Sequence, residues 1–532
     1  MKNKRVGTSL LALALVLEAK TKQITLRWTA AVAMAGGVLL LPGAGGAQAS
    51  GYLWGGFARD PQHTAISPVA AQPLNRIRWR TPVDLQPQYS GDTLLIHYGS
   101  PLVTASNTVI VPVKTGATGG FRVEARNGKD GKLRWKMASD YVLPPHDWTP
   151  SFGPVLTPRS RLYFPGAGGT LYFRDRPDSG TGPTGRIAFY GIANYNADPA
   201  AYAENVMINT PLTSDRDGNI FFGFQVVGPT PLKLQSGIAR IASNGAGTWI
   251  SASAAAGSDP AITKVVHNSA PALSNDHRTL YVAVSNGTGS GFGAGYLVAL
   301  DSQTLAPLAG VRLKDVLSGE DAYLPEAGTA SPTVGPDGDV YFGVLEKPFP
   351  SNHDRGWLLH FDSTLTQAKI PGAFGWDTTA SIVPASAVPS YRGHSTYLLM
   401  TKYNNYAGVG GDGVNKIAVL DPSTPMVDPV SGATVMSEVL TIAGPTPDPE
   451  YSAYPYAVRE WCINTAVVDP ITKSVLANSE DGKLYRWDLT SNTLTQSVTL
   501  TSGIAEAYTP TLIGPDGTVY AVNNGILFAV GQ

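Results

Sequence analysis

A hairpin unit that recurs along the whole chain constrains the fold more than any other feature of the sequence. In residues 330–344 (ASPTVGPDGDVYFGV), an apolar run leads into an Asp-Gly turn and then into a second strand-like run. Asp-Gly between two such runs is a strong signal of a β-hairpin. Related copies lie at residues 100–111, 153–164, 210–222, 270–282, 465–477 and 509–521, with a degenerate copy at 380–400. The sequence therefore contains eight such units.

The spacing of these units indicates a ring of small β-sheets. The proline that opens the unit stands at positions 101, 154, 211, 271 and 332, so the intervals are 53, 57, 60 and 61 residues. A second apolar run follows several copies, and each unit therefore holds three or four short antiparallel strands. This period with four strands per unit is typical of a propeller blade. We predict an all-β chain that forms a single eight-bladed β-propeller of four-stranded antiparallel blades, with two separate β domains as the alternative.

The two ends of the chain supply complementary parts of one blade. The last unit stops after its third strand, at residues 526–530, whereas the strand-like segment RIRWR, residues 76–80, precedes the first unit. We expect the N-terminal strand to join the last blade and close the ring, which leaves few exposed strand edges. This divides the chain into a targeting region (1–49), a lead-in segment that packs on the ring (50–75) and the propeller (76–532).

Residues 1–49 resemble a secretory signal peptide. A basic start (MKNKR) precedes a 13-residue apolar run at 29–41, and Ala47 and Ala49 occupy the small positions of a cleavage site before Ser50. The apolar run is short for a membrane span. We expect a periplasmic or secreted protein with no stable membrane insertion after cleavage. A retained membrane anchor is the alternative.

Charge and cysteine content exclude several classes of protein. The formal net charge is −1 and no run of Lys or Arg occurs, so the electrostatic footprint of a nucleic-acid-binding protein is missing. The single cysteine, Cys462, excludes an intramolecular disulfide, a C-x-x-C metal site and a covalent c-type haem. We expect Cys462 to be a small buried hydrophobic residue, and the protein to be a monomer that binds no nucleic acid.

Two stretches resemble the bacterial PQQ-like (quinoprotein-dehydrogenase-like) β-propeller repeat proteins. Residues 51–67 (GYLWGGFARDPQHTAIS) look like the opening of such proteins. Residues 125–135 (ARNGKDGKLRW) are similar to their tryptophan-docking pattern, A-x-D-x-x-T-G-K-x-x-W, with Asn and Asp in place of its Asp and Thr. The matching residues are Ala125, Gly131, Lys132 and Trp135. The resemblance implies an eight-bladed propeller of the quinoprotein alcohol dehydrogenase type.

The resemblance also bears on cofactors. Active members of the family hold the quinone between a Trp face and a vicinal disulfide, with a calcium ion and a catalytic Asp nearby, whereas cofactor-free members are scaffolds or binding proteins. One cysteine cannot form a vicinal disulfide. We therefore predict no cofactor and no metal site, with PQQ and calcium as the alternative.

Polar residues precede the innermost strand of most units. In a four-stranded blade, the connection that enters this strand and the loop between the second and third strands lie on one face, and the Asp-Gly turns lie on the other. Aligned offsets around a ring bring such residues to the channel mouth, and loops on a rigid scaffold are where binding residues concentrate. The ligand-binding candidates are His97, His146, Asp147, Trp148, His267, Asn268, Glu326, Asp377, Arg459, Glu460, Trp461, Glu506 and Tyr508.

Three functions remain open from the sequence. The leading hypothesis is an exported, non-catalytic propeller that binds a protein or glycan partner through its loop-rich face. The second is a quinoprotein (PQQ-dependent) oxidoreductase. The third is a hydrolase or lyase that uses ionisable residues at the channel mouth as acid and base. The sequence assigns no catalytic residue.

Overall fold

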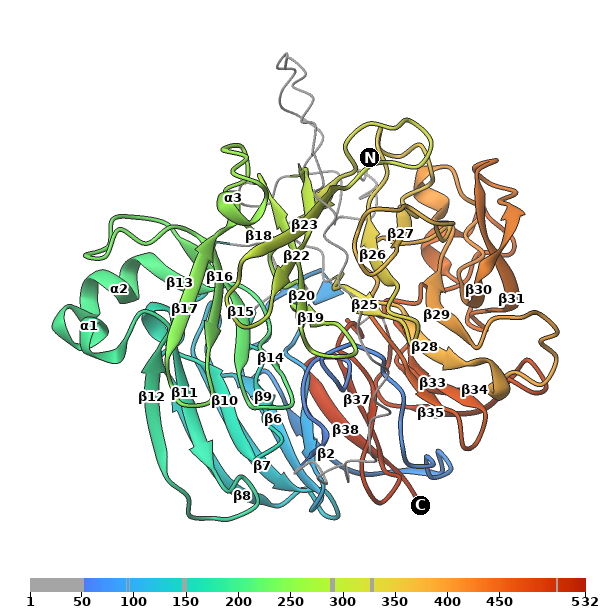
Figure 1. The fold of residues 1–532 in the computed structure, drawn as a ribbon. Helices are drawn as coiled ribbons and strands as arrows, with labels where there is room; N and C mark the ends of the chain where they lie inside the picture. Colours follow the sequence, from blue (N-terminus) through green and yellow to red (C-terminus); the bar gives the residue numbers. More distant parts are fainter. Residues whose placement is uncertain are drawn as a thin grey trace, which may run out of the picture.

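Eight small antiparallel sheets stand around a common centre, and the chain visits them in sequence order (Figure 1). The computed structural model describes residues 52–91, 93–94, 96–145, 151–287, 292–325, 330–503 and 506–532. The predicted all-β, eight-bladed propeller is confirmed. The signal-peptide prediction concerns residues that lie outside the described part of the chain.

Within each blade the strands follow one another from the centre outward. The first four blades are β5 (Leu102–Thr104), β6 (Thr108–Lys114), β7 (Phe121–Asn127) and β8 (Leu133–Ser139); β9 (Val155–Leu156), β10 (Arg161–Pro165), β11 (Thr170–Asp175) and β12 (Thr184–Ala188); β14 (Thr213–Ser214), β15 (Ile220–Val226), β16 (Gly237–Ile241) and β17 (Gly247–Ser251); and β19 (Ala272–Leu273), β20 (Thr279–Ser285), β22 (Gly295–Asp301) and β23 (Pro307–Arg312).

The second half of the ring repeats this order. Blades five to eight are β25 (Thr333–Val334), β26 (Val340–Val344) and β27 (Trp357–Phe361); β28 (Ser381–Pro384), β29 (Tyr397–Tyr403), β30 (Lys416–Val427) and β31 (Thr434–Ala443); β32 (Val467–Asp469), β33 (Ser474–Asn478), β34 (Lys483–Asp488) and β35 (Thr493–Thr499); and β36 (Leu512–Ile513), β37 (Val519–Asn523), β38 (Ile526–Gly531) and β2 (Arg76–Pro82).

The remaining elements are short. β1 (Tyr52–Trp54) pairs with β5, and β13 (Val206–Ile208) and β18 (Lys264–Val265) extend the pairing of the second strands β15 and β20. β3 (Tyr89–Ser90) pairs with β4 (Thr93–Leu94), and β21 (Phe292–Gly293) pairs with β24 (Leu324–Pro325). The helical turns are α1 (Ile192–Ala197), α2 (Pro199–Asn205), α3 (Ala252–Ala255), η2 (Ala167–Gly169), η3 (Ala385–Ala387), η4 (Ala407–Val409) and η5 (Pro449–Tyr451).

The Asp-Gly turns form where the repeat predicts them. Gly338 and Gly517 have φ of 92° and 81°, a left-handed conformation that glycine adopts without steric cost. The Asp337 carboxylate accepts a hydrogen bond from the backbone N–H of Asp339, at 3.0 Å, and fixes the turn. The strand that follows, β26, is buried throughout because neighbouring blades cover both of its faces.

The predicted closure of the ring through the two chain ends is confirmed. β2 pairs antiparallel with β38, from Arg76 opposite Gly531 to Pro82 opposite Ile526, and Figure 1 shows these strands side by side although they are far apart in the chain. The indole N–H of Trp79 in β2 donates to the carbonyl of Gly128 in the first blade, at 2.9 Å. A side chain at Gly131 would collide with the Trp79 ring, so glycine is required where the closing blade meets the first one.

The fifth blade departs from the predicted four strands. β25, β26 and β27 form a three-stranded sheet, and residues 368–372 make only isolated bridges to β27. The long hairpin of β30 and β31 compensates, because Met436 donates its backbone N–H to Pro371, at 2.8 Å, and is buried in the same hydrophobic cluster as β27. The tip of this hairpin reaches the loop after β26, where Arg355 and Asp428 form a fully buried, bidentate ion pair with N···O distances of 2.9 and 3.0 Å.

The segment at residues 52–72 crosses the centre of the ring on the side of the Asp-Gly turns. Its carbonyl groups accept backbone hydrogen bonds from inner strands of five blades: Gly55 from Leu156, Pro61 from Leu273, Gln62 from Val334, Thr64 from Ile382 and Ala65 from Val468, at 2.7–2.9 Å. We call residues 52–72 the central segment. It occupies the turn side of the channel, and we call the loop-rich side the mouth.

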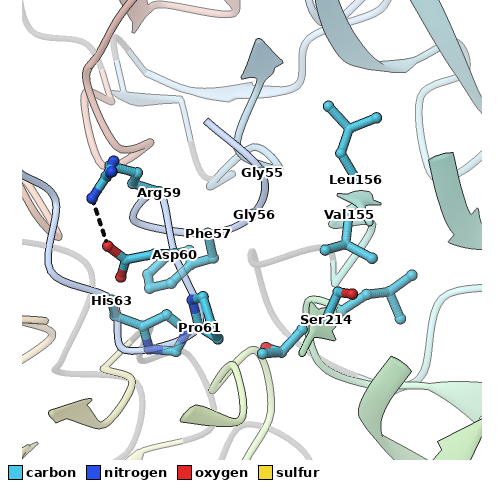
Figure 2. A pocket seen from close by; sticks show the side chains of 12 residues that line it. Gly55, Gly56, Phe57, Arg59, Asp60, Pro61, His63, Val155, Leu156 and Ser214 are labelled. Atoms are coloured by element: carbon cyan, nitrogen blue, oxygen red, sulfur yellow. Dashed lines mark hydrogen bonds and ion pairs between the residues drawn. The ribbon is translucent and has the colours of Figure 1, made fainter. Parts of the chain in front are cut away.

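The central segment is held in an unusual backbone conformation. Ala58, Arg59, His63 and Ala65 all have positive φ, a conformation that persists in non-glycine residues only where the surroundings fix it. Figure 2 shows this segment against the second and third blades, with the Arg59–Asp60 ion pair at 2.9 Å and the rings of Phe57 and His63 close together. The ring therefore imposes the path of the segment.

Candidate functional site

Four of the predicted site residues gather at the mouth of the channel. His97, in the connection before β5, stacks on Tyr508, in the connection before β36, with ring centroids 3.9 Å apart. The Nε2 atom of His97 lies 3.5 Å from a carboxylate oxygen of Glu506. Asp377 precedes β28 and lies in the same group through its ion pair with Lys402, described next. All four side chains are buried.

Lys402, at the end of β29, brings a positive charge into this group. Its Nζ atom lies 3.9 Å from Asp377 Oδ2 and 4.6 Å from the centroid of the Tyr508 ring. The side chain is fully buried, and its ammonium group forms no hydrogen bond among the described residues. Because a buried charge is costly without compensation, the attraction of Asp377 and the Tyr508 ring stabilises the ammonium ion.

A second group lies beside the first, between the sixth and seventh blades. The thiol of Cys462 donates to Glu480 Oε2 at 3.0 Å and lies 3.7 Å from Glu460 Oε2. Glu460 and Cys462 are two residues apart, and their side chains lie on the same side of the chain, because the Cys462 sulfur contacts the Glu460 carboxylate. The intervening Trp461 points the other way, is completely buried and packs edge-on against Tyr485.

Arg459 ties the second group to the loop before the seventh blade. Its Nη1 atom lies 2.8 Å from Glu450, 3.3 Å from Asp448 and 3.8 Å from Glu480. The guanidinium is thus shared by three carboxylates. Arg459 and Lys402 are the cations in contact with these two groups among the described residues, and the carboxyl groups outnumber them.

The loop after β26 contributes one more buried acid. Glu346 folds this loop by accepting backbone N–H groups of Asn352, Asp354 and Gly356, at 3.2, 2.9 and 2.8 Å. Asp354 is 4% exposed, and its Oδ1 atom has no hydrogen-bond partner among the described residues. Burial, together with the charges of Glu346 and Glu460, raises the pKa of Asp354 to about 8.

Burial dominates the electrostatics of the mouth. It raises the pKa of Glu506 well above its usual value, with a further contribution from the charge of Asp377. It also raises the pKa values of Glu460 and Glu480, and the charge of Glu480 adds to the effect on Glu460. Burial lowers the pKa of His97 to about 4. The mouth therefore holds neutral imidazole and carboxyl groups that retain protons near neutral pH.

A cavity with an empty volume of about 340 Å³, including the space open to solvent, lies at this mouth. His97, Asn268, Asn464 and Tyr508 line it, and Phe57 of the central segment contributes to its lining from the turn side. Residues from several connections between blades therefore face one space. The arrangement can donate and accept hydrogen bonds, exchange protons and bind a cation.

The remaining predicted residues have different positions. His267 is buried beside Asn268, and Trp461 faces the blade core, so its ring offers no stacking surface at the mouth. His146, Asp147, Trp148 and Glu326 lie outside the described residues. The expectation for Cys462 was wrong, because its sulfur lies between two carboxylates and is partly exposed.

Lys402, Glu480 and Asp354 were not predicted from the sequence. A detectable signal for Lys402 was a charged residue at the end of an otherwise apolar second strand, and Lys114 and Glu346 follow the same pattern in their blades. Glu480 lies in a tight turn between β33 and β34, and Asp354 in a long loop. Nothing in their local sequence distinguishes them from exposed loop residues.

The described residues do not fit a quinone held as in the active dehydrogenases. That arrangement needs a vicinal disulfide, and Cys462 is the single cysteine. It also needs an indole face at the mouth, and Trp461, one of the tryptophans expected there, is instead fully buried in the blade core. We therefore derive no chemistry through PQQ.

Comparison with solved structures places the fold among known propellers. A europium-containing methanol dehydrogenase is similar over 89% of this chain and 90% of its own, with 10% identity and a TM-score of 0.51. The quinohemoprotein alcohol dehydrogenase from Comamonas testosteroni is similar over 91% and 82%, with 12% identity and a TM-score of 0.51. The Dos1 propeller is similar over 87% and 95%, with 10% identity and a TM-score of 0.51.

These similarities confirm, at the level of the fold, the resemblance to quinoprotein-dehydrogenase-like propellers. At such low identity they carry the fold alone. No family model matches the sequence, and no curated protein matches it. Within the described residues, no helix is both long and apolar enough to cross a membrane.

Proposed function

We propose that this protein is an exported, non-catalytic propeller that binds a protein or glycan partner through its loop-rich face. The observation that carries the proposal is the asymmetry of the channel. The central segment fills the turn side, whereas buried polar side chains from several blade connections converge on the loop side. A mouth of this kind on a rigid ring is better explained by a binding site than by structural packing alone.

The chemistry of the mouth suits hydroxyl or amine groups. Carboxyl groups with raised pKa values donate and accept hydrogen bonds, and the hydroxyls of a sugar do the same. A lysine or arginine side chain of a protein partner would instead convert these groups to carboxylates. Either partner would be anchored at the cavity, and the loops would contact it further out.

The export part of the proposal rests on residues 1–49. Cleavage after Ala49 would release a chain that begins at Ser50, two residues before the first described strand. N-terminal sequencing of the protein from the periplasm or medium should therefore begin near Ser50. Recovery of the intact N-terminus in a membrane fraction would contradict export in soluble form.

Binding can be tested with the mature chain, residues 50–532, on a glycan array and against an array of lysine- and arginine-rich peptides. Glu506→Gln preserves shape while removing the ionisable carboxyl group, so it should weaken binding at least tenfold with little change in melting temperature. Asp337→Asn, on the turn side of the ring, is the matched control and should bind as the unmodified protein does. Equal affinities for both variants would contradict the assignment of the mouth, and a lack of any ligand on either array would contradict the proposed partner classes.

A second candidate is a hydrolase or lyase. One observation favours it: Glu506, whose pKa is raised by burial, lies 3.5 Å from the neutral imidazole of His97. A proton-bearing carboxyl beside an unprotonated base is the arrangement that general acid–base catalysis uses. Turnover of a bound glycan that disappears in Glu506→Gln while binding persists would favour this candidate over the binding protein.

A further inference from the structure

We propose that Glu460, Cys462 and Glu480 form a binding site for a divalent metal ion of the zinc type at the edge of the channel mouth. One potential ligand atom from each residue lies within 4.8 Å of the other two. The Cys462 sulfur is 3.0 Å from Glu480 Oε2 and 3.7 Å from Glu460 Oε2. The inference goes beyond the proposed function, and metal binding does not depend on a partner.

These separations are close to those that one ion requires. Zinc binds carboxylate oxygen at about 2.0–2.2 Å and thiolate sulfur at about 2.3 Å in tetrahedral geometry, which places neighbouring ligand atoms about 3–4 Å apart. Small rotations of the two glutamate side chains would meet this requirement.

The backbone that carries the three ligands is already fixed. The side chain of Asn404 pairs with the backbone of Trp461, accepting its N–H at 3.3 Å and donating to its carbonyl at 3.4 Å. Trp461 itself is fully buried, and it therefore anchors Glu460 and Cys462 on either side. Glu480 lies in a turn closed by the bond from Gly482 N–H to the Ser479 carbonyl, at 3.1 Å.

An independent observation from another blade indicates a missing positive charge. Asp354 is 4% exposed, and its Oδ1 atom has no hydrogen-bond partner among the described residues. The charge of Glu460 acts on the Asp354 carboxyl group, so the two groups lie near each other. A buried carboxyl oxygen without a partner is costly, and a cation beside Glu460, or water bound to it, would satisfy it.

The mixture of ligand types selects the class of ion. Calcium and magnesium prefer sites made of oxygen atoms, whereas a thiolate favours zinc and related transition metals. Three protein ligands leave a coordination position open, as in zinc sites that bind water or substrate. An ion held here would offer that position to an oxygen atom from the channel mouth.

The single cysteine makes the site directly measurable. The mature chain, freed of metal with a chelator, should take up one zinc ion in isothermal titration calorimetry. Cobalt should bind in the same place and give a thiolate-to-cobalt charge-transfer band. Zinc should also slow the reaction of Cys462 with a thiol reagent at least tenfold. The measurement is unambiguous because the chain has no other thiol for the reagent to modify.

Two variants and a control decide the assignment. Glu480→Gln should weaken zinc binding at least tenfold and remove the protection of Cys462, and Cys462→Ser should remove the cobalt band. Glu204→Gln, at an exposed position of α2 between the second and third blades, should change neither. The proposal is overturned if the unmodified protein takes up no zinc, or if zinc binding is unchanged in both ligand variants. Should Glu480→Gln fail to fold, Cys462→Ser and the thiol protection of the unmodified protein give the same decision.

Discussion

At the scale of the residue, His63 in the central segment links the stability of the ring to pH. Its imidazole is 1% exposed, and its Nδ1 atom lies 2.6 Å from the carbonyl of Pro332, which can only accept a hydrogen bond. Nδ1 therefore carries a proton. Burial lowers the pKa of His63 from 6.5 to about 4.

Because its folded pKa is lower than its unfolded pKa, His63 makes the protein less stable in acid. The unfolded chain binds the extra proton between pH 6.5 and 4, so stability is lost as the pH falls through this range. At pH 5 the loss amounts to about 2 kcal/mol. His63→Gln keeps a donor for Pro332, and its free energy of unfolding should fall less between pH 7 and 5 than that of the unmodified protein. Parallel pH profiles from urea unfolding would show that His63 does not cause the effect.

At the scale of the element, the hairpin of β30 and β31 replaces the missing outer strand of the fifth blade. Arg355 and Asp428 join its tip to the loop that carries Asp354. Removing one partner of a buried ion pair leaves an uncompensated charge and costs about 3–5 kcal/mol. Arg355→Ala should lower the free energy of unfolding by that amount. Arg278→Ala removes an 84% exposed partner of Asp276 and should cost about 1 kcal/mol or less.

This prediction also concerns the mouth of the channel. If the hairpin holds the loop after β26 in place, Arg355→Ala should increase amide hydrogen exchange in residues 346–356, beyond any global change. Exchange that is raised equally in all blades would indicate a loss of stability without a specific effect on this loop.

Strand alternation explains why the structure brings some of the candidate residues together at the mouth and not others. The repeats located the connections before the inner strands, and the structure brings His97, Asp377, Glu506 and Tyr508 together there. The orientation of Trp461 depends on which side of an extended stretch faces the blade core, and its neighbours take the opposite side. The sequence does not give the register of this stretch against the blade, so it could not show which side chains face the core and which face the mouth.

Insertions were harder still to predict. The helices α1 and α2 lie between the second and third blades, in a stretch that has no counterpart in the other repeats. Asp354 comes from a loop whose folding depends on the buried Glu346 and on a hairpin from the next blade. Such contacts join residues that are distant in sequence, so local patterns do not reveal them.

At the scale of the whole molecule, the ring is closed twice. β2 and β38 join the two ends of the chain in the eighth blade, and the central segment joins the inner strands of five blades. Both connections come from residues 52–82. The N-terminal part of the propeller therefore depends on blades that are made last, and the last blade depends on it.

This mutual dependence predicts a single cooperative unfolding transition that requires β38. Deleting residues 525–532 removes the partner of β2 and exposes the edge strands β37 and β2. Because the closing blade also docks Trp79 on the first blade, we expect a large fall in melting temperature, and far-ultraviolet circular dichroism and tryptophan fluorescence should report it together. Removing Gln532 alone, which lies beyond β38, should leave the melting temperature nearly unchanged. If the longer deletion melted like the full chain, or if the two probes separated into distinct transitions, the eighth blade would not be what holds the ring together.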